Sequence, residues 1–279
     1  MPKKYEILKK RELSPDTTLI SVYAPLIAKK AKAGQFIILR VDENGERIPL
    51  TISSCTEDAV TVIFQKVGAT TMQLGLLNEG DCLHDFVGPL GVPTEVEGYK
   101  KVVVVGGGLG CAIALPVAKA LHEAGAEVDL VAGFKTKDII ILEDEMKEAC
   151  TNLYICTDDG SYGFAGFTTA KLEELVKEGG YDGAFAIGPL VMMKFCCQVT
   201  KKYNVPTVVS MNPIMIDGTG MCGGCRITVG GETKFACVDG PDFDGFQVDF
   251  DEAIARAATY KEFEGKKKEE HICRLRGAK

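Results

Sequence analysis

The pattern of secondary structure changes near residue 98, and this change most limits how the chain can fold. Before it, short segments rich in β-branched and aromatic residues are separated by turn sequences such as Glu43-Asn44-Gly45. Short alternating strands at close spacing are typical of a small antiparallel barrel or sandwich. We therefore predict an all-β domain over residues 1–97, with strands near 17–23, 35–40 and 59–64.

The next stretch, residues 98–212, alternates strand-like with helix-like segments. Strands are predicted at 102–105, 128–132, 153–157, 184–187 and 207–210, and helices at 113–123, 168–177 and 190–203. This alternation predicts a parallel sheet with helices on its faces. The expected fold is therefore all-β plus α/β, which suits 279 residues because a domain usually holds about 100–200.

Residues 213–241 are rich in glycine and cysteine and almost without periodicity, which indicates backbone shaped around a ligand. The plant-type [2Fe–2S] arrangement is C-x4-C-x2-C followed by a distant cysteine. Three cysteines fill its last three positions, and an aspartate stands in the first. Intervening glycines allow turns that direct N–H groups towards cluster sulfurs. Since a carboxylate can be the fourth ligand, we predict metal ligands at Asp217, Cys222, Cys225 and Cys237.

Two other interpretations of this segment stay open. Three cysteines and one aspartate could close a tetrahedral zinc site, although zinc sites more often pair two CxxC or CxxH motifs. The cysteines could also be reduced core residues at a turn, but that explains neither their spacing nor the glycines.

A glycine-rich turn follows the first strand of the second domain. A strand that feeds such a turn into a helix can place a pyrophosphate on the helix N-terminus. As G-x-G-x-x-G the turn fails at Cys111, and no acidic residue ends the strand at 128–132. Two more loops follow strands, and ligands bind at such carboxyl ends, although ordinary connections would look alike. The candidate nucleotide-binding residues are Gly106, Gly107, Gly108, Gly110, Asp158, Asp159, Gly188 and Pro189.

A weaker signal lies in the first domain, where a cation and two hydroxyls occur together and a Gly-Ala-Thr-Thr turn follows one strand later. Arginine for phosphate, a hydroxyl for a ring nitrogen and a glycine for close approach would suit a flavin dinucleotide. A plain hairpin could show the same residues. The candidate cofactor-binding residues are Arg47, Pro49, Leu50, Thr51, Ser53, Gln65, Gly68, Thr70 and Thr71.

Composition narrows the class of protein. A net charge of −7, from 32 basic and 39 acidic residues, argues against a nucleic-acid-binding protein. The start of the chain lacks a signal-peptide core, and the uncharged stretch 102–118 is short and broken by glycines, so we expect no membrane span. Eleven cysteines, an odd number, fit a reducing cytoplasm. Core positions are expected for Cys111, Cys150, Cys156, Cys196 and Cys197.

Taken together, a domain carrying R-x-P-L-T-x-S, an α/β domain and a C-terminal iron–sulfur loop resemble the ferredoxin–NADP reductase superfamily over essentially the whole chain. Within it the chain is similar to iron–sulfur flavoprotein electron-transfer subunits. One branch serves NAD-dependent dihydroorotate dehydrogenases. The other contains the small (alpha) subunits of NADH-dependent reduced ferredoxin:NADP oxidoreductases, also called sulfide dehydrogenase beta subunits. Residues 211–226 and 270–275 resemble this second branch, where aspartate is a cluster ligand and the first usually has cysteine.

The resemblance implies FAD in the N-terminal barrel, with Thr51 near the flavin N5 as the catalytic residue and Thr70–Thr71 near the pyrophosphate. The superfamily usually places arginine three residues before the hydroxyl. Here that position is Ile48, and Arg47 lies one residue earlier. The resemblance also implies NAD(H) at the three loops of the second domain. NADP(H) stays open, because lysines at 135 and 137 could meet a 2′-phosphate.

The function implied by the resemblance is hydride transfer from NADH to the flavin, followed by single-electron release through the cluster. A larger flavin and iron–sulfur catalytic subunit is the implied partner in a heterodimer, and ferredoxin takes part indirectly. In the second branch the pair performs electron bifurcation among NADH, NADP and ferredoxin. The tail at 242–279, with a helix predicted at 251–260, is expected to contact the partner. The alternatives are the dihydroorotate branch and a non-enzymatic, zinc-stabilised nucleotide sensor.

Overall fold

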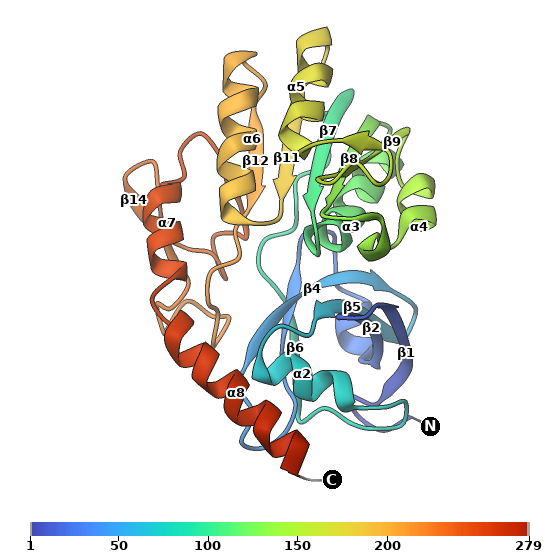
Figure 1. Cartoon of the computed structure of the whole chain (residues 1–279), viewed down its shortest axis with the longest axis vertical. Coiled ribbons are helices and arrows are strands. Elements are labelled where there is room, and N and C mark those ends of the chain that lie inside the picture. The colour runs from blue at the N-terminus through green and yellow to red at the C-terminus, as the bar shows by residue number, and fades with distance from the viewer. Residues whose placement is uncertain (1, 278–279) are drawn as a thin grey trace.

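The computed structural model describes residues 2–277, in which an N-terminal antiparallel sheet lies below an α/β domain (Figure 1). The N-terminal sheet has the strand order β1-β2-β5-β4-β3-β6. Its elements are β1 (Ile7–Ser14), β2 (Thr17–Tyr23), α1 (Pro25–Ala28), β3 (Phe36–Arg40), β4 (Ile48–Cys55), β5 (Ala59–Gln65), α2 (Ala69–Leu76) and β6 (Asp85–Leu90). The antiparallel character predicted for this domain is confirmed.

The two edges of this sheet approach each other without regular strand pairing. Within residues 2–277, an isolated antiparallel bridge joins Glu6, ahead of β1, to Cys82, ahead of β6. Inside the curved sheet lies a core of aliphatic side chains and two phenylalanines, Phe64 and Phe86, both fully buried. Alternate residues of each strand reach this core, which explains the period-two pattern of the sequence.

The α/β domain has a seven-stranded sheet in the order β10-β9-β8-β7-β11-β12-β15. Every neighbouring pair is parallel except β12 and β15. Its elements are β7 (Lys101–Gly107), α3 (Gly110–Glu123), β8 (Glu127–Phe134), η1 (Lys137–Ile139), α4 (Glu143–Glu148), β9 (Asn152–Thr157), β10 (Phe164–Ala165), α5 (Thr168–Glu178), β11 (Gly183–Ile187), α6 (Leu190–Lys202), β12 (Thr207–Ser210) and β15 (Asp242–Asp244).

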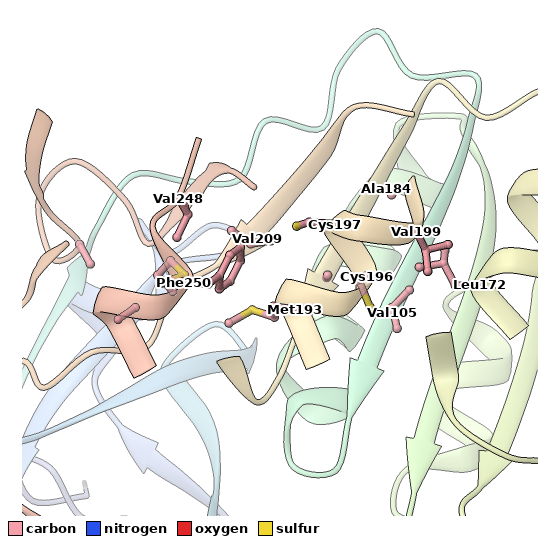
Figure 2. Close-up of a cluster of buried hydrophobic side chains, with 14 of the residues drawn as sticks. Val105, Leu172, Ala184, Met193, Cys196, Cys197, Val199, Val209, Val248 and Phe250 are labelled. Atoms are coloured by element: carbon pink, nitrogen blue, oxygen red, sulfur yellow. The ribbon is translucent and has the colours of Figure 1, made fainter. Parts of the chain in front are cut away.

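Both faces of this sheet are covered by helices, as the continuous apolar strands predict. Val102 and Val104 of β7 face the core shared with α3, whereas Val103 and Val105 face the core shared with α5 and α6. Figure 2 shows the second of these cores, where Met193, Cys196 and Cys197 of α6 pack among strand residues. The expected core positions of the five cysteines are confirmed, since all five are buried.

Strand β3 is buried on both faces and joins the two domains. Ile37 and Leu39 point into the N-terminal core, whereas Phe36 and Ile38 belong to the core that contains Cys225 and Cys237. The uninterrupted apolar run of β3 is therefore explained by two different partners. One is its own domain, and the other is the cysteine-rich segment.

The C-terminal part contains more regular structure than the sequence predicts. The glycine- and cysteine-rich segment includes a hairpin of β13 (Arg226–Val229) and β14 (Glu232–Phe235), and β15 after it joins the α/β sheet. Instead of one helix at 251–260, there are α7 (Phe250–Ala257) and α8 (Lys261–Gly277). Helix α8 runs beside α2 (Figure 1). Its residues 261–267 are all exposed, so this part of the helix has no buried apolar face that the sequence could have revealed.

Among the described residues, no helix has the length and apolar character that crossing a bilayer requires.

A buried carboxylate ties the start of the α/β sheet together. Asp129 on β8 is 1% exposed, and its oxygens accept hydrogen bonds from the Tyr181 hydroxyl and from Asn152 Nδ2, the latter at 2.7 Å. Lys101 Nζ lies 4.0 Å away and also stands over the Tyr181 ring. A buried charge is tolerated when it is paired and hydrogen-bonded, so this network contributes to the stability of the domain.

We predict that Asp129→Ala lowers the free energy of unfolding by about 3 kcal/mol, because it orphans buried donors and leaves Lys101 without this partner. For a domain of this size the thermal midpoint should fall by about 5–10 °C in calorimetry. Glu127→Ala is the matched control, since it removes only an exposed ion pair with Lys101 and should cost less than about 1 kcal/mol. Equal effects of the two substitutions would contradict the assignment.

Candidate functional site

The two buried thiols of the cysteine-rich segment lie side by side. Cys225 immediately precedes β13 and Cys237 lies two residues after β14, and the hairpin pairs Arg226 with Phe235. The two sulfur atoms are consequently 3.2 Å apart, and the side chains are 1% and 2% exposed. Burial raises the pKa of Cys237, so its proton must leave when a metal binds.

The predicted carboxylate ligand belongs to a loop that turns back on itself. Asp217 accepts hydrogen bonds from the backbone N–H of Thr219 at 2.9 Å and of Cys222 at 2.6 Å. These two bonds, with Thr219 the stronger influence, hold the pKa of Asp217 below its usual value. The N–H of Gly220 in the same loop is directed at Cys237. The structure thus brings Asp217 beside Cys222 and Cys225 beside Cys237, and the Asp217 loop contacts Cys237.

Three thiols and one carboxylate match the number of protein ligands that a two-iron cluster uses. Among the described residues, no group of three or more His, Cys, Asp and Glu side chains is arranged to hold one metal ion. A [2Fe–2S] cluster divides four protein ligands between two irons, so each iron needs only a pair. Asp217 with Cys222 and Cys225 with Cys237 are such pairs.

The predicted nucleotide loops meet at one edge of the α/β sheet. Gly106–Gly110 ends β7 and Gly188–Pro189 ends β11, the neighbouring strand. The loops touch so closely that a Cβ on Gly110 would lie 2.4 Å from the Ile187 carbonyl oxygen. Strands β8 and β9 lie to one side of β7 and β11 to the other, which is the switch point where α/β sheets bind ligands.

The third loop lies against the end of β8. The N–H groups of Asp158 and Asp159 donate to the carbonyl oxygens of Phe134 at 3.0 Å and Lys135 at 3.3 Å. Asp159 accepts hydrogen bonds from the Ser161 hydroxyl and N–H, which lower its pKa, whereas Asp158 is exposed. The carboxylates therefore stand beside the strand end where the dinucleotide pattern expects an acid.

The predicted flavin residues on strand β4 lie on two opposite faces of the strand. Ile48, Leu50 and Ile52 point into the N-terminal core, so Leu50 offers a ligand only its backbone. Pro49, Thr51 and Ser53 alternate with them on the outer face, which α3 of the second domain approaches.

Helix α2 begins beside an open space suited to phosphate. Its N-cap is Gly68, where an added Cβ would meet nothing within 4 Å, and first-turn N–H groups have no intrahelical acceptor. Thr71 caps the helix by accepting from the N–H of Val67 and Gly68. Thr70 donates to Glu46 at 3.0 Å, so the Glu46 side chain, from the residue before Arg47, reaches this helix end.

Two contacts at this site are not evident from the sequence. The amide of Gln65 donates to Asp16 at 2.6 Å, so part of its hydrogen-bonding capacity is already used. The contact of Glu46 with Thr70 joins residues 24 positions apart. In the sequence, only the position of Glu46 next to Arg47 could have indicated this contact between Glu46 and Thr70.

The cysteine-rich segment lies two strands away from Thr51. Thr51 pairs with Phe36 of β3, and Phe36 pairs with Leu90 of β6, two ladder steps that together span about 10 Å. A Cβ on Gly218 would lie 2.6 Å from Leu90 Cδ1, and the glycine has φ +74°, which other residues rarely adopt. Gly218 follows Asp217 directly, so the predicted cluster ligand lies against the same small sheet that carries the predicted flavin contact.

Comparison with known proteins agrees with this arrangement. Residues 212–249 match the family model of the iron-sulfur cluster binding domain of dihydroorotate dehydrogenase B. A Thermotoga maritima protein, described as an electron transfer subunit homolog of dihydroorotate dehydrogenase B (NAD(+)), is 47% identical over 93% of this chain and 92% of its own length. The chain belongs to the dihydroorotate dehydrogenase B electron transfer subunit family. A Clostridium perfringens member is 31% identical over 82% of this chain and 92% of its own.

Solved structures share the fold of this chain. A chain of the NADH-dependent reduced ferredoxin-NADP oxidoreductase, described in the context of flavin-based electron bifurcation, has a TM-score of 0.93 and 44% identity. The match covers 98% of this chain and 99% of that one. The Amycolatopsis cytochrome P450 reductase GcoB shares the fold, with a TM-score of 0.61 and 22% identity over 71% of this chain and 65% of its own. The resemblance predicted from the sequence is confirmed, and this family member is an oxidoreductase subunit.

We predict that Cys225→Ala abolishes the bound cluster, because it removes one of two ligands to the same iron. Native protein purified anaerobically should contain about two irons per chain, and the variant should contain almost none. Cys273→Ala, which alters an exposed cysteine on α8, is the control and should keep full iron and sulfide content. Full iron content in the Cys225 variant would contradict the assignment.

Proposed function

We propose that this chain accepts electrons from NADH at FAD and relays them through a [2Fe–2S] cluster to a larger partner subunit, within a complex that couples NADH, NADP and ferredoxin by electron bifurcation. The observation that carries the proposal is the aspartate at the first cluster position, combined with the 44% identity and full-length match to the NADH-dependent ferredoxin-NADP oxidoreductase chain. Because the proposed reaction uses dinucleotides and the described cysteines are free thiols, as a reducing compartment allows, we propose a cytoplasmic location.

The N-terminal domain supplies the flavin site of the proposal. FAD provides a group that accepts a hydride and releases electrons singly. The α2 N-terminus holds its diphosphate, with Gly68 leaving room and Arg47 supplying positive charge. On β4, Thr51 presents a hydroxyl on the outer face, beside the entry of α3. Thr51 thereby orients the ring towards the second domain.

The α/β domain supplies the NADH site. Gly106–Gly110 and Gly188–Pro189 hold the pyrophosphate and nicotinamide end at the switch point, near the outer face of β4. Asp158 and Asp159 lie further along the same edge, where they face the adenosine ribose. Carboxylates there accept hydrogen bonds from ribose hydroxyls and repel a 2′-phosphate, so we infer a preference for NADH over NADPH.

The surface around the cluster ligands fits contact with a partner. Met221 is 89% exposed next to Cys222, and Ile216 and Val238 are close to half exposed beside Asp217 and Cys237. Exposed apolar side chains that gather around a reactive centre mark interaction sites. A partner seated there would receive electrons directly from the cluster.

We predict that the chain co-purifies anaerobically with a larger flavin and iron–sulfur subunit, identifiable by mass spectrometry. The complex should reduce NADP⁺ with reduced ferredoxin only while NADH is also present, since bifurcation couples the two electron donors. Co-purification with a dihydroorotate-oxidising dehydrogenase would instead assign the chain to pyrimidine-type electron transfer. NADP⁺ reduction that ignores NADH would contradict the bifurcating role.

We also predict that Asp158→Asn lowers the KM for NADPH about tenfold, because one fewer negative charge faces a doubly charged 2′-phosphate. The KM for NADH should rise slightly, and binding of 2′,5′-ADP should tighten in calorimetry while 5′-ADP binding changes little. Glu123→Gln, at the far end of α3, removes the same charge away from the edge and serves as control. Identical KM ratios in both variants would contradict the placement of the ribose.

A further inference from the structure

The segment that connects the two domains touches the cluster-binding segment on both sides of its ligands. Leu90, at the end of β6, packs against Gly218, which follows Asp217. Two residues later, the N–H of Val92 donates to the carbonyl oxygen of Gly240 at 2.7 Å. Gly240 lies three residues after Cys237. The connection between the domains therefore holds the cluster-binding segment at its beginning and at its end.

The contact with the best-defined geometry joins Thr94 to Asp242. The Thr94 hydroxyl donates to Asp242 Oδ2 at 2.5 Å, and Thr94 is 7% exposed. Asp242 starts β15 and pairs with Ser210, whose hydroxyl supplies another hydrogen bond. Burial raises the pKa of Asp242, and these hydroxyls offset part of that cost. A hydrogen bond to a charged acceptor is stronger than a neutral one, especially away from water.

Thr94 is itself held by the N-terminal domain. Its N–H donates to the carbonyl oxygen of Ala33 at 3.0 Å, in the loop ahead of β3. Neighbouring Gly34 packs so tightly that an added Cβ would lie 2.0 Å from the Thr94 hydroxyl oxygen. Thr94 therefore connects the N-terminal domain to the Asp242 carboxylate, which belongs to the α/β sheet.

A second series of hydrogen bonds reaches the predicted flavin contact. The Gln35 side chain, 8% exposed, donates to the carbonyl oxygen of Gly91 at 2.8 Å. Its backbone oxygen accepts from Ile52 at 3.0 Å, and Ile52 directly follows Thr51. From Thr51 to Gly240 the contacts therefore pass through Gln35 and the connecting segment without a gap.

We propose that Thr94 and Asp242 are positioning residues that set the separation of flavin and cluster, and thereby the rate of electron transfer between them. This inference rests on the proposed function, since it needs both cofactors. Electron transfer slows steeply as the separation grows, and loss of one charge-assisted hydrogen bond weakens the contact between the connecting segment and β15 by about tenfold or more. The pair acts through the backbone and touches neither cofactor.

The test uses the full chain carrying both cofactors, with Thr94→Val as the main variant. After partial chemical reduction, magnetic dipolar coupling between the two paramagnetic cofactors reports their separation without any need for NADH. We expect the coupling to weaken or spread in the variant, and cluster reduction after mixing with NADH to slow about tenfold. Flavin reduction by NADH should keep its native rate. Thr94→Ser, which restores the hydroxyl, should restore both signals.

Matched controls separate positioning from general stability. Thr61→Val removes a buried hydroxyl of the same type, bonded to Ser21 at 2.8 Å, and should leave the dipolar coupling unchanged. Asp242→Asn keeps an oxygen that can accept from Thr94 but removes the charge, so it should weaken the dipolar coupling less than Thr94→Val does. Combined with Thr94→Val it should add little, because both substitutions act on the same interaction.

Native coupling in Thr94→Val would overturn the inference, and so would slower cluster reduction with unchanged coupling. If Thr94→Val loses iron, the same measurements on Asp242→Asn decide the matter. A native protein whose cluster accepts no electrons from NADH would instead contradict the proposed function, and the chemically reduced sample would still test the separation.

Discussion

Burial of β3 on both faces is the constraint on which the rest of the molecule depends. Ile37 and Leu39 complete the N-terminal core, whereas Phe36 and Ile38 complete the core around the cluster-binding segment. One strand thus cannot shift without disturbing two cores, and close-packed interiors resist such shifts. The proposed flavin site on β4 and the predicted cluster ligand next to Gly218 both lie close to this strand, because β4 and β6 are its two neighbours in the sheet.

The protein itself contributes little reactive chemistry, and its composition reflects this. The chain has three histidines, and none belongs to the predicted flavin, nucleotide or cluster sites. The reactive groups are those of the cofactors, so the side chains bind, orient and separate them. Glycines at 107, 110 and 218 illustrate the point, because each permits an approach that a Cβ would block. The predicted sites therefore depend on close packing of the chain around its cofactors and not on acid–base side chains.

Much of this arrangement follows from local sequence pattern. Strands 17–23 and 207–210 coincide with β2 and β12, and the switch to strand–helix alternation marks the α/β domain. The spacing of Cys222, Cys225 and Cys237 is a local property too, and the structure brings two of these residues, Cys225 and Cys237, side by side.

The sequence pattern missed two kinds of feature. The first depends on contacts between distant segments, and the second is a helix that lacks an apolar face. The return of β15 to the α/β sheet and the pairing of Thr94 with Asp242, 148 residues apart, leave no trace in any short window. Residues 261–267 of helix α8 are exposed and mostly charged, so hydrophobic periodicity could not reveal the start of this helix. The roles of Arg47 and Thr51 likewise depend on which face of β4 meets α3.

The central claim is that electrons entering from NADH pass from the flavin to the cluster of the same chain. Rapid anaerobic mixing with NADH, followed by freezing and electron paramagnetic resonance, tests it most directly. The account predicts bleaching of the flavin and then a reduced-cluster signal that grows to match the amount of protein. A bleached flavin beside a cluster that stays silent, although dithionite reduces it, would contradict the account.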